Sequence, residues 1–164
     1  MSKYSPKKKP SLATIQEYRI PLPKEYTLLG DQEDYEQLPP HWQEQIHFYD
    51  KAGSDFLYQY WDSSNLITGP LYQPFLGSPF THLEQLTSWE SQELAQWLYD
   101  RGLTFGQEVW LLSNFRHTAV QMTWKMVIKL REELFVGDDV VLFDNSLQWC
   151  LFYYHEEVLF WGRY

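Results

Sequence analysis

The chain has a single cysteine and no long hydrophobic run. Cys150 cannot form an internal disulfide on its own, which suits a reducing compartment, and we expect a cytoplasmic protein. No segment approaches the roughly 18 consecutive apolar residues that a membrane span needs, so we expect no membrane partner. The basic start of the chain runs into Pro10 and Ser11 without an apolar stretch, and we therefore expect no secretory signal peptide.

Familiar catalytic motifs are also missing. The sequence contains no glycine-rich phosphate loop, no nucleophile elbow, and no two histidines four residues apart with a glutamate between them. Cys150 lies in an apolar run, where a free cysteine is usually a core residue rather than a nucleophile. The sequence thus predicts no catalytic residue, no cofactor and no metal, and it favours a non-enzymatic protein without excluding an enzyme.

Aromatic and acidic residues are abundant instead. The chain has 8 Trp, 12 Tyr and 10 Phe, more than a core of this size can bury, so some must lie at the surface, as interface aromatics do. The net charge is -9, and removing the four lysines of residues 1–10 leaves 9 basic against 22 acidic residues, or -13. A field of that sign disfavours nucleic acid and attracts a basic protein partner.

The order of residue types predicts a disordered basic tail, residues 1–14, followed by a single α+β domain, residues 15–164. Helices are expected to come first, one from about Pro39 to Gly53 and a second, short one capped by Ser54. Residues 62–86 contain three Pro and two Gly, which predicts an ordered loop over the core and a candidate binding lip. The capping-box pattern Thr87-x-x-Glu90 predicts another helix, closed by Gly102.

The C-terminal half is predicted to be a β-α-β-β-β unit. A strand over 107–112 leads into one long central helix that runs from Ser113 or Asn114 to about Leu134, because apolar residues make a broad stripe there. Three apolar runs then form an antiparallel meander packed on that helix: Val140–Phe143, Leu147–Tyr154 and Val158–Trp161. These runs do not alternate, so either both sheet faces are covered or one face awaits a partner.

One core is expected to join the helix to the meander. The broad helical stripe has no other apolar surface of comparable size to meet. The residues predicted to share this core are Trp124, Met126, Leu130, Trp149 and Leu151.

Acidic residues occupy two turns of the predicted meander that lie at the same end of the sheet. Clustered carboxylates with a histidine suit a divalent metal or an acid/base pair, but their spacing matches no metal signature. Turn chemistry and a docking surface for a basic partner are the simpler interpretations. With two aromatic residues of the 62–86 loop, they form the candidate partner-binding set: Asp138, Asp139, His155, Glu156, Glu157, Tyr72 and Phe75.

Two segments resemble known proteins. Residues 138–162, with an acidic turn, Val-Val-Leu-Phe-Asp and Phe-Trp-Gly, resemble the closing meander of small uncharacterised or immunity-type bacterial proteins. Residues 21–29, with Leu22-Pro23-x-x-Tyr26, resemble the opening segment of the SMI1/KNR4 immunity superfamily. Neither resemblance carries a functional residue with it; together they imply an inhibitor of a toxin or effector domain.

Three functions follow as hypotheses. The first is a protein-binding domain, most concretely an immunity-type inhibitor or adaptor, that engages a basic partner through acidic and aromatic surface. The second is a small metal-dependent hydrolase or nuclease that uses the carboxylates and the histidine at one end of the sheet. The third is a structural homodimer in which the apolar meander pairs across a twofold axis.

Overall fold

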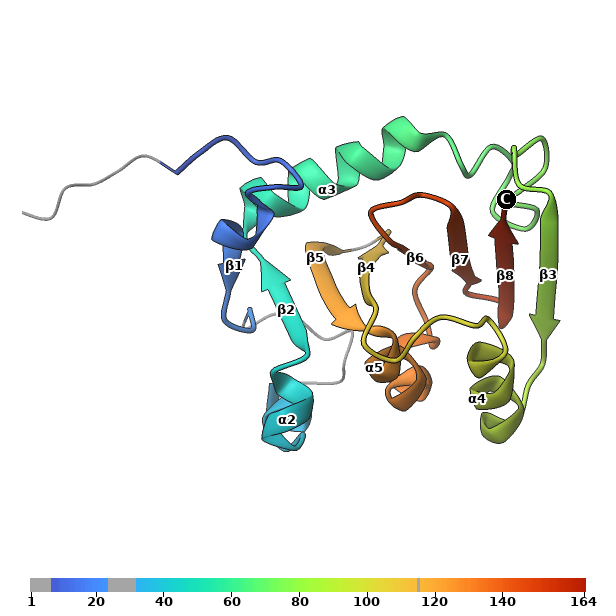
Figure 1. Cartoon of the computed structure of the whole chain (residues 1–164). Coiled ribbons are helices and arrows are strands. Elements are labelled where there is room, and N and C mark those ends of the chain that lie inside the picture. The colour runs from blue at the N-terminus through green and yellow to red at the C-terminus, as the bar shows by residue number, and fades with distance from the viewer. Residues whose placement is uncertain (1–6, 24–31, 115) are drawn as a thin grey trace, which may run out of the picture.

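The computed structural model of the chain describes residues 7–23, 32–114 and 116–164. Within them an antiparallel sheet of eight strands has helices on both faces, which confirms the predicted mixture of helix and sheet (Figure 1). The strands are β1 (Arg19–Ile20), β2 (Ile46–Tyr49), β3 (His82–Thr87), β4 (Glu108–Ser113), β5 (Arg116–Thr123), β6 (Val140–Phe143), β7 (Trp149–Tyr154) and β8 (Val158–Arg163). Their order across the sheet is β1-β2-β5-β4-β6-β7-β8-β3.

The helices divide between the two faces of the sheet. They are the 3-10 helix η1 (Ile15–Tyr18) and the α-helices α1 (Gln32–Glu36), α2 (Pro40–Gln43), α3 (Lys51–Ser64), α4 (Ser91–Tyr99), α5 (Trp124–Lys129) and α6 (Arg131–Leu134). Figure 1 shows α3 along one side of the sheet and α2, α5 and α4 on the other. No helix in the described ranges is long and apolar enough to cross a membrane.

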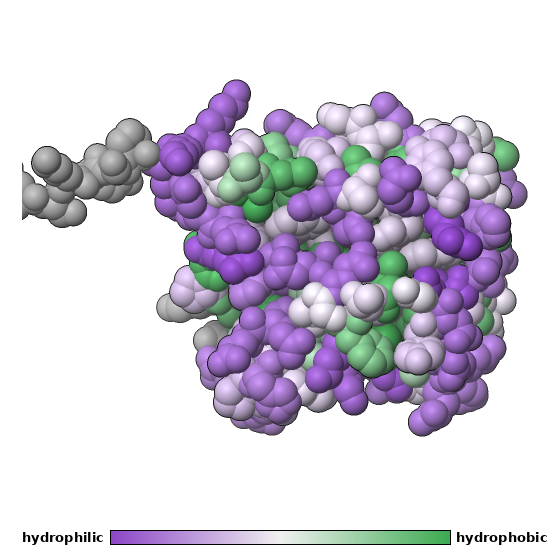
Figure 2. Space-filling view, viewed as in Figure 1, coloured by the Kyte–Doolittle hydropathy of each residue, from purple (hydrophilic) through white to green (hydrophobic). Residues whose placement is uncertain are grey.

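Each face of the sheet has its own core, because successive residues of a strand point to opposite faces. On β4, Val109 and Leu111 join the cluster under α4, α5 and α6, whereas Trp110 and Leu112 join the cluster under α3 and η1. Both faces are therefore covered, which explains why the strands are apolar without alternation. On the side of the molecule seen in Figure 2, the surface is largely hydrophilic with separate apolar patches.

The predicted common core is confirmed. Trp124, Met126, Leu130, Trp149 and Leu151 all belong to the cluster on the α4–α5–α6 face. Three tryptophan rings form a continuous series of contacts there, with Trp149 in the middle. The Trp149 ring stacks on that of Trp161 with the centroids 5.0 Å apart, and it meets the Trp124 ring edge to face with the centroids 5.9 Å apart. This series joins α5 to the far side of the meander.

The predicted long central helix is wrong over its first half. Residues 116–123 form β5, which pairs with β4 on one side and β2 on the other, and the helical part is split into the short α5 and α6. Ala119, Val120, Gln121 and Met122 are all buried, since β5 is sandwiched between two helical layers. In a strand buried on both faces, apolar and polar residues do not alternate with a period of two. Its apolar residues can therefore be mistaken for the apolar stripe of a helix. Phe115 of that stripe lies outside the described residues.

The second half of the chain therefore has the element order β-β-α-α-β-β-β instead of the predicted β-α-β-β-β. Its last three strands are those predicted.

The expected helix over 39–53 is also wrong beyond its first turn. After the single turn of α2, residues 46–49 form β2, and α3 begins at Lys51, where the Asp50 carboxylate accepts a hydrogen bond of 2.9 Å from the Gly53 N–H. Gly53 does not end a helix. It allows a close approach of η1 instead, because a Cβ there would lie 2.8 Å from the Tyr18 Cβ.

Residues 65–81 form the expected loop over the core, although the prediction of 62–86 took in the end of α3 and most of β3. Its anchor is Phe80, a buried residue whose ring lies against Gly162 of β8. A Cβ at Gly162 would meet that ring at 2.5 Å, so glycine is required where the loop lies on the sheet. The following α4 has its capping box at Glu90 and Glu93, three residues after the expected cap at Thr87.

Residues 7–14 of the predicted tail contact the domain. The Lys7 ammonium lies 3.2 Å from the Asp50 carboxylate, and the Tyr18 hydroxyl donates to the Lys8 carbonyl. Residues 1–6 lie outside the described ranges. The boundary between tail and domain at residue 14 stays a prediction.

Candidate functional site

Asp139 and His155 meet at the end of the sheet where the sequence places both acidic turns. Asp139 precedes β6, and one carboxylate oxygen lies 2.8 Å from the His155 backbone nitrogen, which donates to it, and 2.8 Å from the His155 Nδ1. The other oxygen accepts a hydrogen bond of 3.1 Å from the Asn114 side chain. The Asp139 carboxylate is buried and surrounded by donors, so it fixes the turn after β7 to the beginning of β6.

The other predicted site residues are spread around this pair. Glu156 and Glu157 are exposed in the turn between β7 and β8, and Asp138 is half-buried. In the 65–81 loop, the Tyr72 side chain is exposed, whereas Phe75 is buried with its ring centroid 5.3 Å from that of Phe80. Their role in binding a partner stays a prediction; Tyr72 has the accessibility for it, and Phe75 supports the loop from below.

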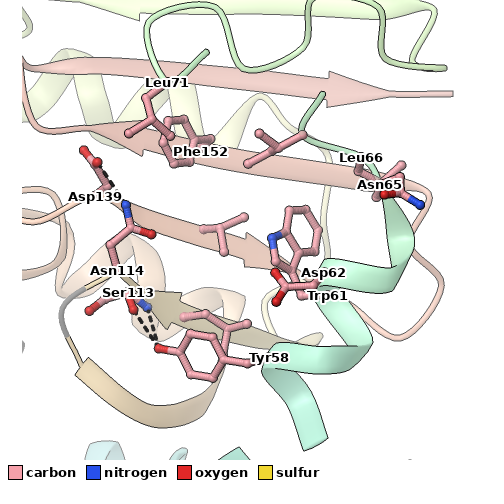
Figure 3. Close-up of a pocket in the computed structure, with 13 residues that line it drawn as sticks. Tyr58, Trp61, Asp62, Asn65, Leu66, Leu71, Ser113, Asn114, Asp139 and Phe152 are labelled. Atoms are coloured by element: carbon pink, nitrogen blue, oxygen red, sulfur yellow. Dashed lines mark hydrogen bonds between the residues drawn. The ribbon is translucent and has the colours of Figure 1, made fainter. Parts of the chain in front are cut away.

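A pocket of about 230 Å³ lies beside Asp139, between α3, the 65–81 loop and the sheet. We call it the α3 pocket. Figure 3 shows residues of α3 facing Asn114 and Asp139 across the hollow, with Leu71 and Phe152 on a third side. The full set of lining residues is Tyr58, Trp61, Asp62, Asn65, Leu66, Ile67, Leu71, Leu112, Ser113, Asn114, Asp139, Val141 and Phe152.

The α3 pocket combines aromatic walls with carboxylate and amide groups, and its described lining contains no Lys or Arg. Asp62 is exposed, and no hydrogen bond or ion pair joins its carboxylate to any other described residue. Asp62 also lies in the last turn of α3, which has no basic residue. A carboxylate there opposes the helix dipole, so a cation bound near it would relieve an unfavourable interaction.

Tyr58 forms the floor of the pocket with its hydroxyl group fixed. The hydroxyl donates to the Ser113 carbonyl at 2.7 Å and accepts from the Ser113 backbone N–H at 3.2 Å (Figure 3). Burial, with a smaller contribution from the Asp62 charge, raises the pKa of Tyr58 to about 12. The hydroxyl therefore stays neutral and holds α3 to the end of β4.

Replacing Tyr58 with phenylalanine should lower the free energy of unfolding by about 1–3 kcal/mol, because two hydrogen bonds between the hydroxyl and the Ser113 backbone are lost. Since the folded-state pKa of Tyr58 is raised to about 12, its contribution is complete below pH 10 and is lost as pH rises through 12. Urea unfolding of both proteins should show a constant stability difference up to about pH 10 that narrows above it. A difference that widens with alkalinity would contradict this assignment.

Other candidate chemistry is scarce in the described part of the chain. No three His, Cys, Asp or Glu side chains lie close enough together there to hold a metal ion. Cys150 lies fully buried on β7, where burial raises the pKa of its thiol well above the ordinary value. That environment keeps the thiol protonated and unsuited to nucleophilic attack.

Comparison with known proteins gives no relative: no family model, no curated protein and no solved structure matches this chain. The residues Tyr58, Trp61, Asp62 and Asn65 of the α3 pocket were missed by sequence reasoning. The sequence does indicate a short aromatic helix followed by a long loop, and this succession could have pointed to the pocket. The sequence does not indicate that β4 and β6 lie beneath the helix and the loop.

Proposed function

We propose that this protein is a non-enzymatic binding domain, of the immunity-inhibitor or adaptor type, that holds a basic side chain of a protein partner in the α3 pocket. The observation that carries the proposal is the Asp62 carboxylate. It lies on the rim of an aromatic pocket without a partner among the described residues and against the dipole of its own helix.

The size of the α3 pocket supports one side chain rather than a cofactor. Its volume of about 230 Å³ is below the range of about 300–1,000 Å³ typical of small-molecule sites. Arginine and lysine side chains have an apolar stem and only donors at the tip. The pocket offers the matching parts, with Leu66 and Phe152 for the stem and Asp62 and Asn65 for the tip. Aromatic rings nearby, such as Trp61, also attract cations.

The surface around the α3 pocket supports a protein as the source of that side chain. Leu71 at the rim is 41% exposed and Tyr72 next to it 63% exposed, which gives the apolar contact typical of protein interfaces. The net charge of -9 would speed association with a basic partner. The resemblance of residues 138–162 to immunity-type proteins agrees with this proposal.

A model peptide tests the proposal. We expect a fluorescein-labelled arginine-rich peptide to bind, and the same peptide with citrulline, an uncharged analogue of arginine, to bind at least tenfold more weakly in polarisation assays. Asp62→Asn should weaken arginine-peptide binding about fivefold to tenfold, equivalent to about 1–1.4 kcal/mol. The matched control is Glu133→Gln, which removes the same charge from an exposed position on α6, across the sheet.

The Glu133→Gln control distinguishes binding in the α3 pocket from a general attraction of the peptide by the negative charge of the protein. If both variants weaken binding equally, the peptide responds only to the net charge, and the α3 pocket is not the site. Equal binding of the arginine and citrulline peptides would also contradict the proposal. Added salt should weaken binding, because Asp62 is exposed and exposed charges are screened by salt.

The hydrolase hypothesis has one observation in its favour, the contact of 2.8 Å between Asp139 and the His155 Nδ1. Both Asp139 oxygens, however, already accept hydrogen bonds from protein donors, so a metal would have to displace them. Thermal melts with millimolar Mg²⁺, Mn²⁺ or Zn²⁺ decide the matter. A rise of several degrees that Asp139→Asn removes would support the enzyme instead.

A further inference from the structure

The outer edge of β3 is an unpaired sheet edge. β3 is six residues long and pairs only with β8 in the described part of the chain, and it is the outermost strand in Figure 1. Such an edge presents a row of free backbone donors and acceptors, which natural proteins usually protect with proline, charge or a covering segment. β3 has no proline and one glutamate, Glu84.

The register shows which backbone groups point outward. Tyr164 N–H donates to the Gln148 carbonyl, so the even-numbered residues of β8 bond to β7 and its odd-numbered residues bond to β3. In β3 the residues opposite those odd-numbered positions are 82, 84 and 86. The N–H and C=O groups of Leu83, Gln85 and Thr87 therefore point away from the sheet.

A groove of about 550 Å³ follows this edge on the face that also carries α3. We call it the β3 groove. Its apolar lining comes from the loop, from β8 and from β3 itself, and includes Phe75, Leu76, Phe80, Leu83 and Phe160. Leu76 is 62% exposed and Leu83 is 54% exposed, so apolar surface lies beside the unpaired backbone. Edge and groove together form one continuous surface, and the groove is lined by residues of the 65–81 loop other than those that line the α3 pocket.

We propose that this edge pairs with the β3 edge of a second copy of the chain to form a symmetric dimer. At the edge itself, the local charge suits a second copy better than the basic partner of the α3 pocket. Among the described residues that line the β3 groove, Glu84 alone is charged, and its carboxylate forms an ion pair with Arg101. The edge is thus close to neutral on a chain of net charge -9, so a basic segment gains little here, and pairing two edges brings no uncompensated like charges together at the contact.

The sequence of β3 is self-complementary in one register. With Gln85 of each copy opposite Gln85 of the other, Leu83 faces Thr87, and the outward groups of these three residues form six hydrogen bonds. Glu84 then lies opposite Leu86 instead of another Glu84, which avoids a direct repulsion of like charges. The two β3 grooves join across the axis, because Leu83 and Gln85 lie on the same face in both copies.

Oligomeric state and a cysteine cross-link test this dimer. Light scattering should give twice the chain mass of 19.8 kDa. Gln85→Cys should form an intermolecular disulfide, since paired residues of this kind have Cα atoms about 5.5 Å apart, within the disulfide range. His82→Cys, at the end of the same strand, is the control and should cross-link at least tenfold more slowly. Cys150 is buried and does not interfere.

Gln85→Pro separates the dimer from the fold. The Gln85 N–H points outward, so proline in both copies removes two of the six dimer bonds and no bond to β8, and we expect a folded monomer with an unchanged circular dichroism spectrum. Leu83→Lys, which places a charge in the β3 groove, should have the same effect. A wild-type chain that stays monomeric at all concentrations would overturn the proposal. So would a dimer that neither variant weakens. Peptide binding at the α3 pocket is independent of either result.

Discussion

Replacing Trp149 with alanine should lower the free energy of unfolding by about 3–5 kcal/mol, the range found for buried large-to-small substitutions. Trp149 is 5% exposed, and its ring lies between those of Trp124 and Trp161. Its indole N–H also donates to the Asp144 carboxylate at 2.9 Å, an oxygen that Gln107 binds as well. The substitution leaves a cavity that the two flanking tryptophans cannot fill without leaving their own contacts.

Urea unfolding measures this loss, and Tyr99→Ala is the control. Tyr99 is also a large aromatic residue, but it is 58% exposed at the end of α4, and its truncation should cost much less, below about 1 kcal/mol. A loss below 1 kcal/mol for Trp149→Ala would show that the three tryptophans do not form the packed series described for the core. Equal losses for both variants would contradict it too.

Replacing Asp139 with alanine should cost about 3 kcal/mol, since hydrogen bonds to a charged group are worth about 1.5–3 kcal/mol and their buried partners would be left unpaired. Asp139 is 3% exposed and binds the His155 backbone and side chain and the Asn114 side chain. Asp139→Asn keeps one acceptor and should lose less. The turn before β8 should loosen, which amide hydrogen exchange of residues 155–158 measures.

Glu156→Gln is the matched control for Asp139, because it removes a charge from an exposed position in the same turn. The free energy of unfolding of the Glu156→Gln variant should differ from that of the wild type by no more than about 0.5 kcal/mol. If Asp139→Ala changed the free energy of unfolding as little as Glu156→Gln, the Asp139 carboxylate would not anchor the turn, and the role assigned to it would be wrong.

Local patterns explain how much of this fold the sequence predicts. The β6–β7–β8 meander was predicted because short polar turns, 144–146 and 155–157, interrupt apolar runs and leave only hairpins as connections. The same topology predicted that Asp139 would lie near His155. The common core was predicted from its apolar residues even though the helix assumed for them was too long.

Long-range pairing explains what was missed. β2 has only four residues, and Ile46 and Tyr49 also fit a helical spacing with Trp42, so nothing local distinguishes strand from helix. β2 is stabilised by pairing with β5, about 70 residues later, and β5 is in turn buried under helices on both sides. The α3 pocket was missed for the same reason, since Asp62 and Asn114 come together only through that sheet.

The most direct test of the proposed function follows the indole N–H signal of Trp61 by ¹H–¹⁵N NMR, assigned by its loss in Trp61→Phe. Trp61 lines the α3 pocket, whereas Trp149 and Trp161 lie on the opposite face of the sheet. On titration with the arginine-rich peptide, the Trp61 signal should shift and saturate at the affinity measured by polarisation, while those of Trp149 and Trp161 stay in place. At the same concentrations the citrulline peptide should shift the Trp61 signal much less and leave those of Trp149 and Trp161 in place. An unmoved Trp61 signal at saturating arginine peptide would contradict the account, and it would place the peptide elsewhere on the acidic surface.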